Sequence, residues 1–270
     1  MCSGINLQAN LQTMTAGIQQ AAADGACFYF APEMSLLLDR NRERAAKSIV
    51  TEAENIAVAA ISKAAEDFGI WVHLGSLAVR SERHSPLYAN RTLVIGPDGT
   101  VRARYDKIHL FDVDLSTGES WRESSAYAPG AGPVTLDTPL GLMGLAICYD
   151  MRFPDLFSAY SKEEVSVITV PAAFTVPTGK AHWHTLLRAR AIEAEAFVIA
   201  AAQAGKHEDG RQTYGRSLVI DPWGTVLLDM GVEEGVGYAE IDLARIAEVR
   251  AQIPVHANRR EIGSYLNNDC

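Results

Sequence analysis

Apolar positions along the chain follow two alternating spacings, one typical of helices and one typical of strands. The helical spacing runs through residues 7–22 and again through 49–68, where Ile49, Ile56 and Phe68 belong to one stripe. Short apolar runs at 27–31 and 70–79 are typical of buried strands. The first third of the chain is therefore predicted to alternate helix and strand.

A hairpin follows these elements, and its sequence recurs later in the chain. Residues 92–95 and 100–104 flank Gly96-Pro97-Asp98-Gly99, a strong turn signal. Residues 91–101 and 216–226 share eight identical positions out of eleven. The repeat indicates that one domain contains two similar halves.

The second half repeats the alternation with strands at 142–147, 165–170 and 197–202 and helices at 153–160 and 181–196. Two mixed sheets packed face to face, with helices outside, would bury both sets of strands. We therefore predict a single αββα four-layer sandwich over residues 1–270, with an internal pseudo-twofold repeat. Residues 111–133 are expected to form an ordered loop, and about 250–270 a tail that docks or stays mobile.

The repeat also predicts a gap in the first half. The second half opens with a strand, residues 142–147, before its first helix. Residues 1–6 occupy the equivalent place and have no strand-like pattern. We expect the first half to lack its opening strand.

Cys148 stands at the abrupt end of the apolar run 142–147, and Phe153-Pro154 then starts a helix. This pattern predicts a strand-to-helix elbow with the sulfur at the carboxyl end of a sheet, where open α/β sheets bind ligands. A nearby helix amino terminus would favour the thiolate. The alternative is a small buried hydrophobic residue, the usual environment of a free cysteine.

Glu33 and Lys107, like Cys148, each follow a strand-like run. Taken singly, either would be assigned to the solvated surface. Together the three suit one reaction, in which a thiolate attacks a carbonyl, a carboxylate moves protons and an ammonium stabilises the oxyanion. The set is a stronger indication of catalysis than the cysteine alone.

Composition excludes several other classes of protein. The net charge of −9 argues against nucleic acid and anionic membranes as partners, and 48% hydrophobic residues are ordinary for a globular chain. The cysteines Cys2, Cys27, Cys148 and Cys270 are far apart, which suggests neither zinc nor a disulfide framework and favours a cytoplasmic location. His182 and His184 lie two apart on a predicted helix and point to different sides, so we expect no metal.

Three segments resemble the signatures of the nitrilase, or carbon–nitrogen hydrolase, superfamily. They are Ala31-Pro32-Glu33-Met34-Ser35, Tyr105-Asp106-Lys107-Ile108-His109-Leu110 and the segment from Ile147 to Pro154. The resemblance implies a Glu33-Lys107-Cys148 triad without a cofactor, an αββα fold and assembly into a homodimer or higher homo-oligomer. It further implies that Glu123 positions the lysine, that Lys107 and the Tyr149 N–H hold the oxyanion, and that Ala173 and Phe174 line the substrate site.

Other segments indicate which branch of this superfamily the chain resembles. Tyr149-Asp150 after the cysteine looks like the amidase branches, and residues 181–193, 200–205 and 221–224 resemble the deaminated glutathione amidases, neighbours of the omega-amidases. A small amide that bears a carboxylate is therefore the expected substrate, either deaminated glutathione or α-ketoglutaramate. Arg122, Arg152 and Lys180 are candidate cations for that carboxylate, and Arg152 equally suits a structural ion pair. A catalytically silent scaffold is the alternative from another class.

Overall fold

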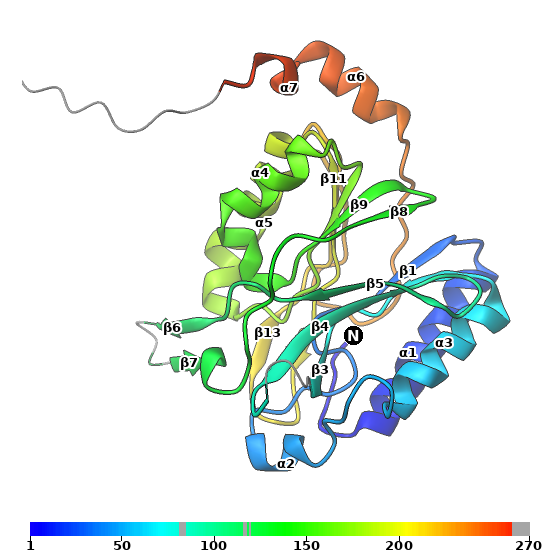
Figure 1. The fold of residues 1–270 in the computed structure, drawn as a ribbon, viewed down its shortest axis with the longest axis vertical. Coiled ribbons are helices and arrows are strands. Elements are labelled where there is room, and N and C mark those ends of the chain that lie inside the picture. Colours follow the sequence, from blue (N-terminus) through cyan, green and yellow to red (C-terminus); the bar gives the residue numbers. More distant parts are fainter. Residues whose placement is uncertain (81–84, 116–117, 119, 261–270) are drawn as a thin grey trace, which may run out of the picture.

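The computed structural model describes residues 1–80, 85–115, 118 and 120–260. Two mixed β-sheets pack face to face, and helices cover the outer side of each (Figure 1). The predicted αββα sandwich is confirmed.

The first sheet consists of β1 (Phe28–Phe30), β2 (Trp71–His73), β3 (Leu77–Arg80), β4 (Tyr88–Ile95) and β5 (Val101–Asp106). Strand β1 runs parallel to β2, and β4 runs antiparallel to β2, β3 and β5. Helices α1 (Leu7–Ala23) and α3 (Ile56–Phe68) cover its outer face with a layer of apolar side chains.

Asparagines set the starts of these two helices. The Asn6 side chain accepts a hydrogen bond from Ala9 N and caps α1, an interaction worth about 1 kcal/mol. The Asn55 side chain accepts hydrogen bonds from the N–H groups of Ala57 and Val58, so α3 begins at Ile56. The predicted helix start at Ile49 is wrong, because Asn55 ends the preceding irregular segment, which contains the short helix α2 (Arg42–Ala46).

The second sheet has the strand order β15-β14-β11-β10-β9-β8. Helices α4 (Pro154–Lys162) and α5 (Val176–Ala194) cover its outer face (Figure 1). The strands are β8 (Thr135–Thr138), β9 (Gly141–Leu145), β10 (Val167–Thr169), β11 (Phe197–Ala200), β14 (Leu218–Ile220) and β15 (Val226–Asp229). Strand β8, which pairs with β9 in a hairpin, was not predicted.

The internal repeat is visible in the pairing of the strands. In the first sheet β1 pairs parallel with β2, and β4 pairs antiparallel with β2 and β5. The second sheet repeats this order, because β10 pairs parallel with β11, and β14 pairs antiparallel with β11 and β15. Each hairpin contains a register shift at the same repeat position, between Val94 and Ile95 and between Val219 and Ile220. The turn glycines Gly99 and Gly224 also correspond, with φ of 74° and 85°, a backbone region that favours glycine.

The two sheets differ at one edge. Strands β9 and β8 extend the second sheet beyond β10, whereas β1, the counterpart of β10, pairs only with β2 among the described strands. This edge is the place where the repeat predicts a further strand.

Side chains from both sheets form the central core, including Phe28, Val94 and Tyr105 from the first sheet and Leu145 and Ile168 from the second. A buried polar pair links the two sheets there: His73 Nε2 on β2 lies 3.0 Å from Thr169 Oγ1 on β10. His73 Nδ1 accepts a hydrogen bond from Gly75 N, and burial lowers the pKa of His73 to about 3. A neutral histidine therefore links the sheets.

The remaining elements lie around this sandwich. The predicted loop 111–133 contains β6 (Asp112–Asp114), β7 (Ser120–Arg122) and the 3-10 helix η2 (Glu123–Ser125), and β12 (Ala204–Lys206) pairs with β13 (Gln212–Tyr214). Helices α6 (Ala244–Gln252) and α7 (Val255–Asn258) extend beyond the second sheet (Figure 1). Within the described residues, no helix combines the length and apolar character needed to cross a membrane.

Candidate active site

Glu33 lies in the loop after β1, against a break in the neighbouring strand. Residues 70–79 were predicted as one strand, but the structure divides them into β2 and β3 at Gly75. Gly75 has φ of 79°, and a Cβ atom there would lie 1.9 Å from the Pro32 carbonyl oxygen. Only glycine permits this approach, which brings the Glu33 loop against the sheet.

Lys107 follows β5 and ends between two carboxylates. Its Nζ atom lies 3.0 Å from Glu33 Oε1 and 2.9 Å from Glu123 Oε2. The Lys107 side chain is only 2% exposed, Glu33 7% and Glu123 13%. Glu123 is itself held in η2, where its Oε2 accepts a hydrogen bond from Phe111 N at 2.7 Å.

Cys148 stands at the predicted elbow after β9, at the start of the 3-10 helix η3 (Cys148–Arg152). Its φ of 47° is unusual for a residue with a side chain, and its N–H donates to the Pro171 carbonyl oxygen at 2.9 Å. The Asp150 carboxylate supports the turn, because its Oδ2 accepts hydrogen bonds from Ile147 N and from the Tyr105 hydroxyl. The backbone at Cys148 is thus held from both sides.

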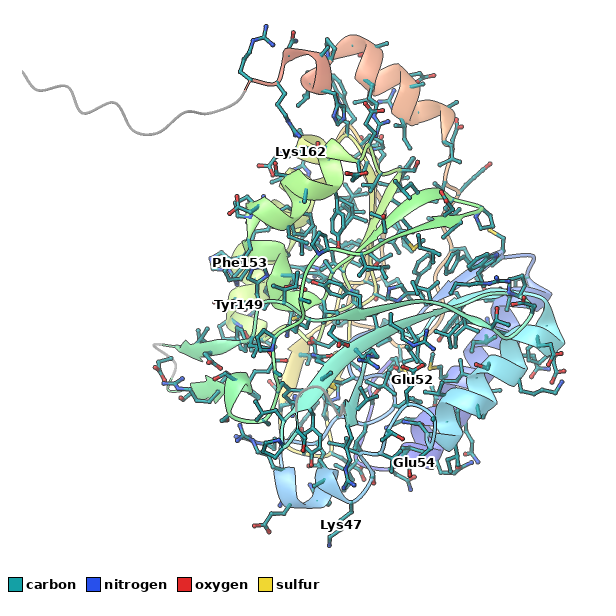
Figure 2. The ribbon with its side chains drawn as sticks, viewed as in Figure 1. Lys47, Glu52, Glu54, Tyr149, Phe153 and Lys162 are labelled. Carbon is teal, nitrogen blue, oxygen red and sulfur yellow. The ribbon has the colours of Figure 1, made fainter. Side chains whose placement is uncertain are left out.

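His109 supports the same turn. Its N–H donates to Asp150 Oδ1 at 2.9 Å, and its Nδ1 lies 2.7 Å from that oxygen. The His109 ring also stacks on Phe153 with centroids 3.6 Å apart. Figure 2 labels Phe153 beside Tyr149, whose ring centroid lies 5.3 Å away. These contacts tie the lysine strand to the cysteine turn.

Two further groups hold the carboxylates, and sequence reasoning missed one of them entirely. The Asn90 side chain, 1% exposed on β4, donates its Nδ2 hydrogens to Glu33 Oε1 at 3.0 Å and Glu123 Oε1 at 3.2 Å. The sequence carried little signal for it, because Asn90 precedes the predicted strand 92–95, whereas β4 begins at Tyr88. Ala173, predicted to line the substrate site, donates its backbone N–H to Glu33 Oε2 at 2.8 Å.

Burial and charge pairing set the protonation of the site. Burial alone would raise the pKa of Glu33, but the Lys107 ammonium and the hydrogen bonds from Cys148 and the Ala173 N–H together outweigh it and hold that pKa below its ordinary 4.5. Burial would lower the pKa of Lys107, but Glu123 and Glu33 hold it well above 10.5. The resting site therefore contains a charged lysine beside an ionised Glu33.

The Cys148 thiol behaves differently from the sequence expectation. Burial, together with the adjacent Glu33 carboxylate, raises its pKa well above 9.0, and Lys107 offsets this only in part. The expectation that a helix amino terminus favours the thiolate is not met, because the helix that starts at Cys148 is only the short 3-10 helix η3 and the sulfur lies in an enclosed site beside Glu33. The cysteine rests as a thiol next to a carboxylate that can accept its proton.

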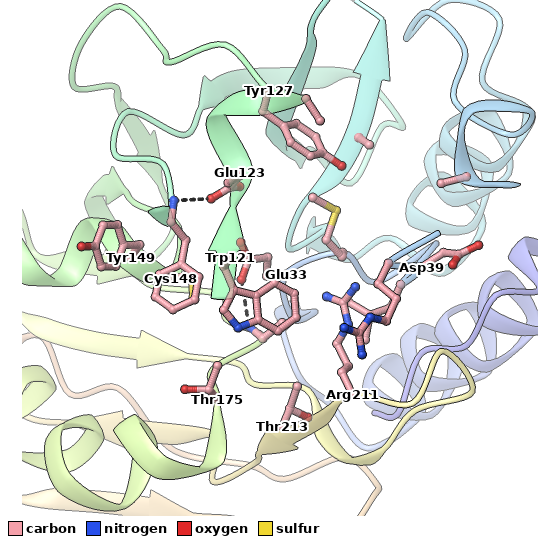
Figure 3. Close-up of a pocket in the computed structure, with 18 of the residues that line it drawn as sticks. Glu33, Asp39, Trp121, Glu123, Tyr127, Cys148, Tyr149, Thr175, Arg211 and Thr213 are labelled. Atoms are coloured by element: carbon pink, nitrogen blue, oxygen red, sulfur yellow. Dashed lines mark hydrogen bonds between the residues drawn. The ribbon is translucent and has the colours of Figure 1, made fainter. Parts of the chain in front are cut away.

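A cavity of about 310 Å³ opens onto these groups (Figure 3). Glu33, Lys107, Glu123 and Cys148 all line it, as do the predicted substrate-site residues Tyr149, Ala173 and Phe174. The predicted triad, the second glutamate and these three residues are thus brought together in one pocket.

The three predicted cations are placed differently. Arg122 lines the cavity but pairs with Asp114 at 2.6 Å, whereas Arg152 and Lys180 are not among its described lining residues. The Arg152 guanidinium lies 5.4 Å from the centroid of the Phe174 ring and 3.3 Å from His182 Nδ1. The described residues Arg40, Arg42 and Arg211, which sequence reasoning did not single out, line the cavity instead.

The arrangement contains every group that hydrolysis of an amide through a thioester needs. A thiol faces a carboxylate, and a buried ammonium lies where it can stabilise an oxyanion. An αββα sandwich with this site defines a class of protein, the thiol-dependent hydrolases of carbon–nitrogen bonds.

Comparisons with known proteins support this class. Residues 3–251 match the family profile described as carbon–nitrogen hydrolase. The chain is 40% identical to the deaminated glutathione amidase of Mus musculus over 263 residues, covering 94% of this chain and 80% of that protein. It is 38% identical to omega-amidase NIT2 of Homo sapiens, covering 90% and 86%.

A solved structure agrees with the fold. The crystal structure of the NitFhit protein of C. elegans superposes with a TM-score of 0.87 at 36% identity, covering 96% of this chain and 63% of that one. The chain belongs to the carbon–nitrogen hydrolase family, and it is an amidase of the nitrilase superfamily.

Proposed function

We propose that this amidase hydrolyses the amide bond of deaminated glutathione through a thioester on Cys148. The observation that carries the mechanism is the convergence of Cys148, Glu33, Lys107 and Glu123 on one buried cavity. The names of the relatives support the substrate, which is glutathione with a keto group in place of its amino group.

In the first step Glu33 accepts the thiol proton as the sulfur attacks the amide carbonyl carbon. The Lys107 ammonium and the Tyr149 N–H hold the resulting oxyanion. When the intermediate collapses, the carbon–nitrogen bond breaks, and the leaving amine takes the proton from Glu33. The products of this step are a thioester on Cys148 and a free amine.

In the second step Glu33 removes a proton from water, and the hydroxide adds to the thioester carbonyl. Collapse releases a carboxylic acid and returns the proton to the sulfur. Glu123 positions Lys107 throughout, because it supplies the second carboxylate beside the ammonium. The intact set of four residues argues against a catalytically silent scaffold.

One comparison tests the substrate. Purified protein is given deaminated glutathione and α-ketoglutaramate side by side, with release of cysteinylglycine and of ammonia measured as kcat/KM. We expect the higher value on deaminated glutathione. Higher efficiency on α-ketoglutaramate would assign the omega-amidase reaction, which the NIT2 relative at 38% identity supports as the second candidate.

We further propose that the enzyme is a cytoplasmic homodimer or higher homo-oligomer. Exposed apolar side chains support assembly, since Ile192 is 46%, Trp223 44% and Ile253 50% exposed. The free thiols of Cys2, Cys27 and Cys148 agree with a reducing compartment. Analytical ultracentrifugation measures the assembly, and a mass equal to one chain would contradict it.

A further inference from the structure

The catalytic cavity has a second end, away from Cys148, with a different chemical character. Aromatic rings lead toward it: Tyr149 lies 5.0 Å from Phe111, and Phe111 lies 6.3 Å from Trp121, centroid to centroid. Figure 3 shows Trp121 between Cys148 and Arg211. The wall thus continues from the nucleophile to a basic region.

Positive charge gathers at this end, although the whole chain carries a net charge of −9. Beyond the catalytic groups, the charged residues that line the described cavity are four arginines and one aspartate: Arg40, Arg42, Arg122, Arg211 and Asp39. Asp39 pairs with Arg44, Arg122 with Asp114 and Arg211 with Asp209, so Arg40 and Arg42 are the lining cations without a carboxylate partner among the described residues. The region therefore suits an anionic group.

Arg211 is the most firmly placed of these cations. Its Nε donates to Asp209 Oδ2 at 2.7 Å, its Cζ lies 5.2 Å from the Trp121 centroid, and its side chain is 17% exposed. No described residue accepts a hydrogen bond from its two Nη groups. A planar guanidinium fixed at Nε leaves those groups available for a carboxylate.

Arg40 lies against the same indole ring, with Cζ 6.0 Å from its centroid. Its backbone N–H donates to Asp209 Oδ2 at 2.9 Å, so one aspartate fixes the positions of both arginines. The Arg40 guanidinium has no carboxylate partner among the described residues. Trp121 adds a donor, because its Nε1 is buried without a hydrogen-bond partner in the described part of the chain.

We infer that Arg40 and Arg211, arranged around Trp121, bind the terminal carboxylate of the leaving peptide. This inference rests on the proposed function and names the group that distinguishes a peptide amide from a short keto-acid amide. The leaving peptide has two residues beyond the scissile bond, which span about 7 Å when extended. Its terminal carboxylate can therefore lie further along the aromatic wall, away from Cys148. Trp121 Nε1 is placed to donate to a carbonyl of that peptide.

The test uses two substrates that differ only in the distal charge, deaminated glutathione and its C-terminal carboxamide. For the wild-type enzyme we expect kcat/KM to favour the acid by about 10- to 100-fold, the effect of losing a charged hydrogen-bonded pair. Equal values for the two substrates would overturn the inference and leave the proposed function intact.

Two variants locate the preference. Arg40→Gln removes an exposed cation, and Arg211→Lys keeps the charge beside Asp209 while removing the planar fork. In each we expect the acid-to-carboxamide ratio to fall about 10-fold. The matched control is Arg102→Gln, which removes an exposed arginine of β5 that pairs with Asp98. A similar fall in that control would show a general charge effect and overturn the inference.

A binding measurement separates the inference from the proposed function. Cys148→Ala protein is titrated calorimetrically with the acid and the carboxamide. Tighter binding of the acid than of the carboxamide supports the carboxylate subsite. If the wild-type enzyme nevertheless hydrolyses neither peptide, only the substrate proposal is refuted. Equal affinities, or no binding of either peptide, would overturn the subsite.

Discussion

The side-chain amide of Asn90 lies 3.0 Å from Glu33 Oε1 and donates a hydrogen bond to it. The same nitrogen reaches Glu123 Oε1, so one neutral residue holds both carboxylates that flank Lys107. Two ionised carboxylates near each other repel, and the amide together with the ammonium offsets that repulsion. Asn90 is thus a positioning residue in the proposed mechanism.

Replacing Asn90 tests this role. We expect Asn90→Leu to lower kcat by about 10- to 100-fold, because both carboxylates lose a buried hydrogen bond. The acid limb of the kcat/KM profile should move to higher pH, since that hydrogen bond favours the ionised Glu33. A loss of melting temperature with unchanged kcat and an unchanged pH profile would indicate a purely structural residue.

Cys148→Ala tests the nucleophile. We expect amide hydrolysis to fall by about 1000-fold or more, because no other group in the cavity can form the thioester. The melting temperature should change little, because the substitution removes one buried atom. Wild-type is also expected to accumulate an acyl adduct on Cys148, detectable by mass spectrometry after rapid acid quench. Substantial hydrolysis by the folded alanine variant would refute the mechanism.

The pH dependence follows from the protonation of the site. The lowered pKa of Glu33 keeps it ionised until the pH falls below 4.5, and the raised pKa of Cys148 keeps the thiol neutral until the pH exceeds 9.0. We therefore expect kcat/KM to be level between about pH 6 and pH 8. An apparent pKa near 7 in this profile would contradict the assignment.

The stability of the folded state should depend on pH through Glu33 and Lys107. The ionised Glu33 stabilises the fold above pH 4.5, and this contribution is lost as the pH falls through its lowered pKa. The ammonium of Lys107 stabilises the fold below pH 10.5, and this contribution is lost as the pH rises through its raised pKa. Melting temperatures measured across the pH range separate unfolding from changes in catalysis.

The edge of β1 gives a prediction about stability. Because β10 pairs with β9 whereas β1 pairs only with β2 among the described strands, we propose that the first half accepts one more strand. Adding about six to eight strand-forming residues before Met1 should raise the melting temperature by at least about 4 °C. A Gly/Ser extension of equal length is the control. Equal melting temperatures for the two extensions would exclude this interpretation.

Much of the architecture was predictable because it depends on local pattern. The helical stripe that became α1, the strand at Phe28–Phe30 and the repeated hairpins around Gly99 and Gly224 follow from spacing and turn chemistry, which short segments determine largely by themselves. The candidate triad was predictable as residue types that share one reaction, each after a strand. The motif resemblance then supplied Glu123.

Other features of the site depend on contacts between segments that are distant in the chain, and only the tertiary structure determined these. The break at Gly75 arises from the approach of Pro32, and the roles of Asn90 and the Ala173 N–H arise from strands brought around Glu33. The protonated state of Cys148 follows from enclosure, which removes water from the sulfur and adds a neighbouring carboxylate. Likewise Arg40 and Arg211, 171 positions apart in number, meet at Asp209 and Trp121. Such contacts depend on packing between segments distant in the chain, which local spacing does not encode.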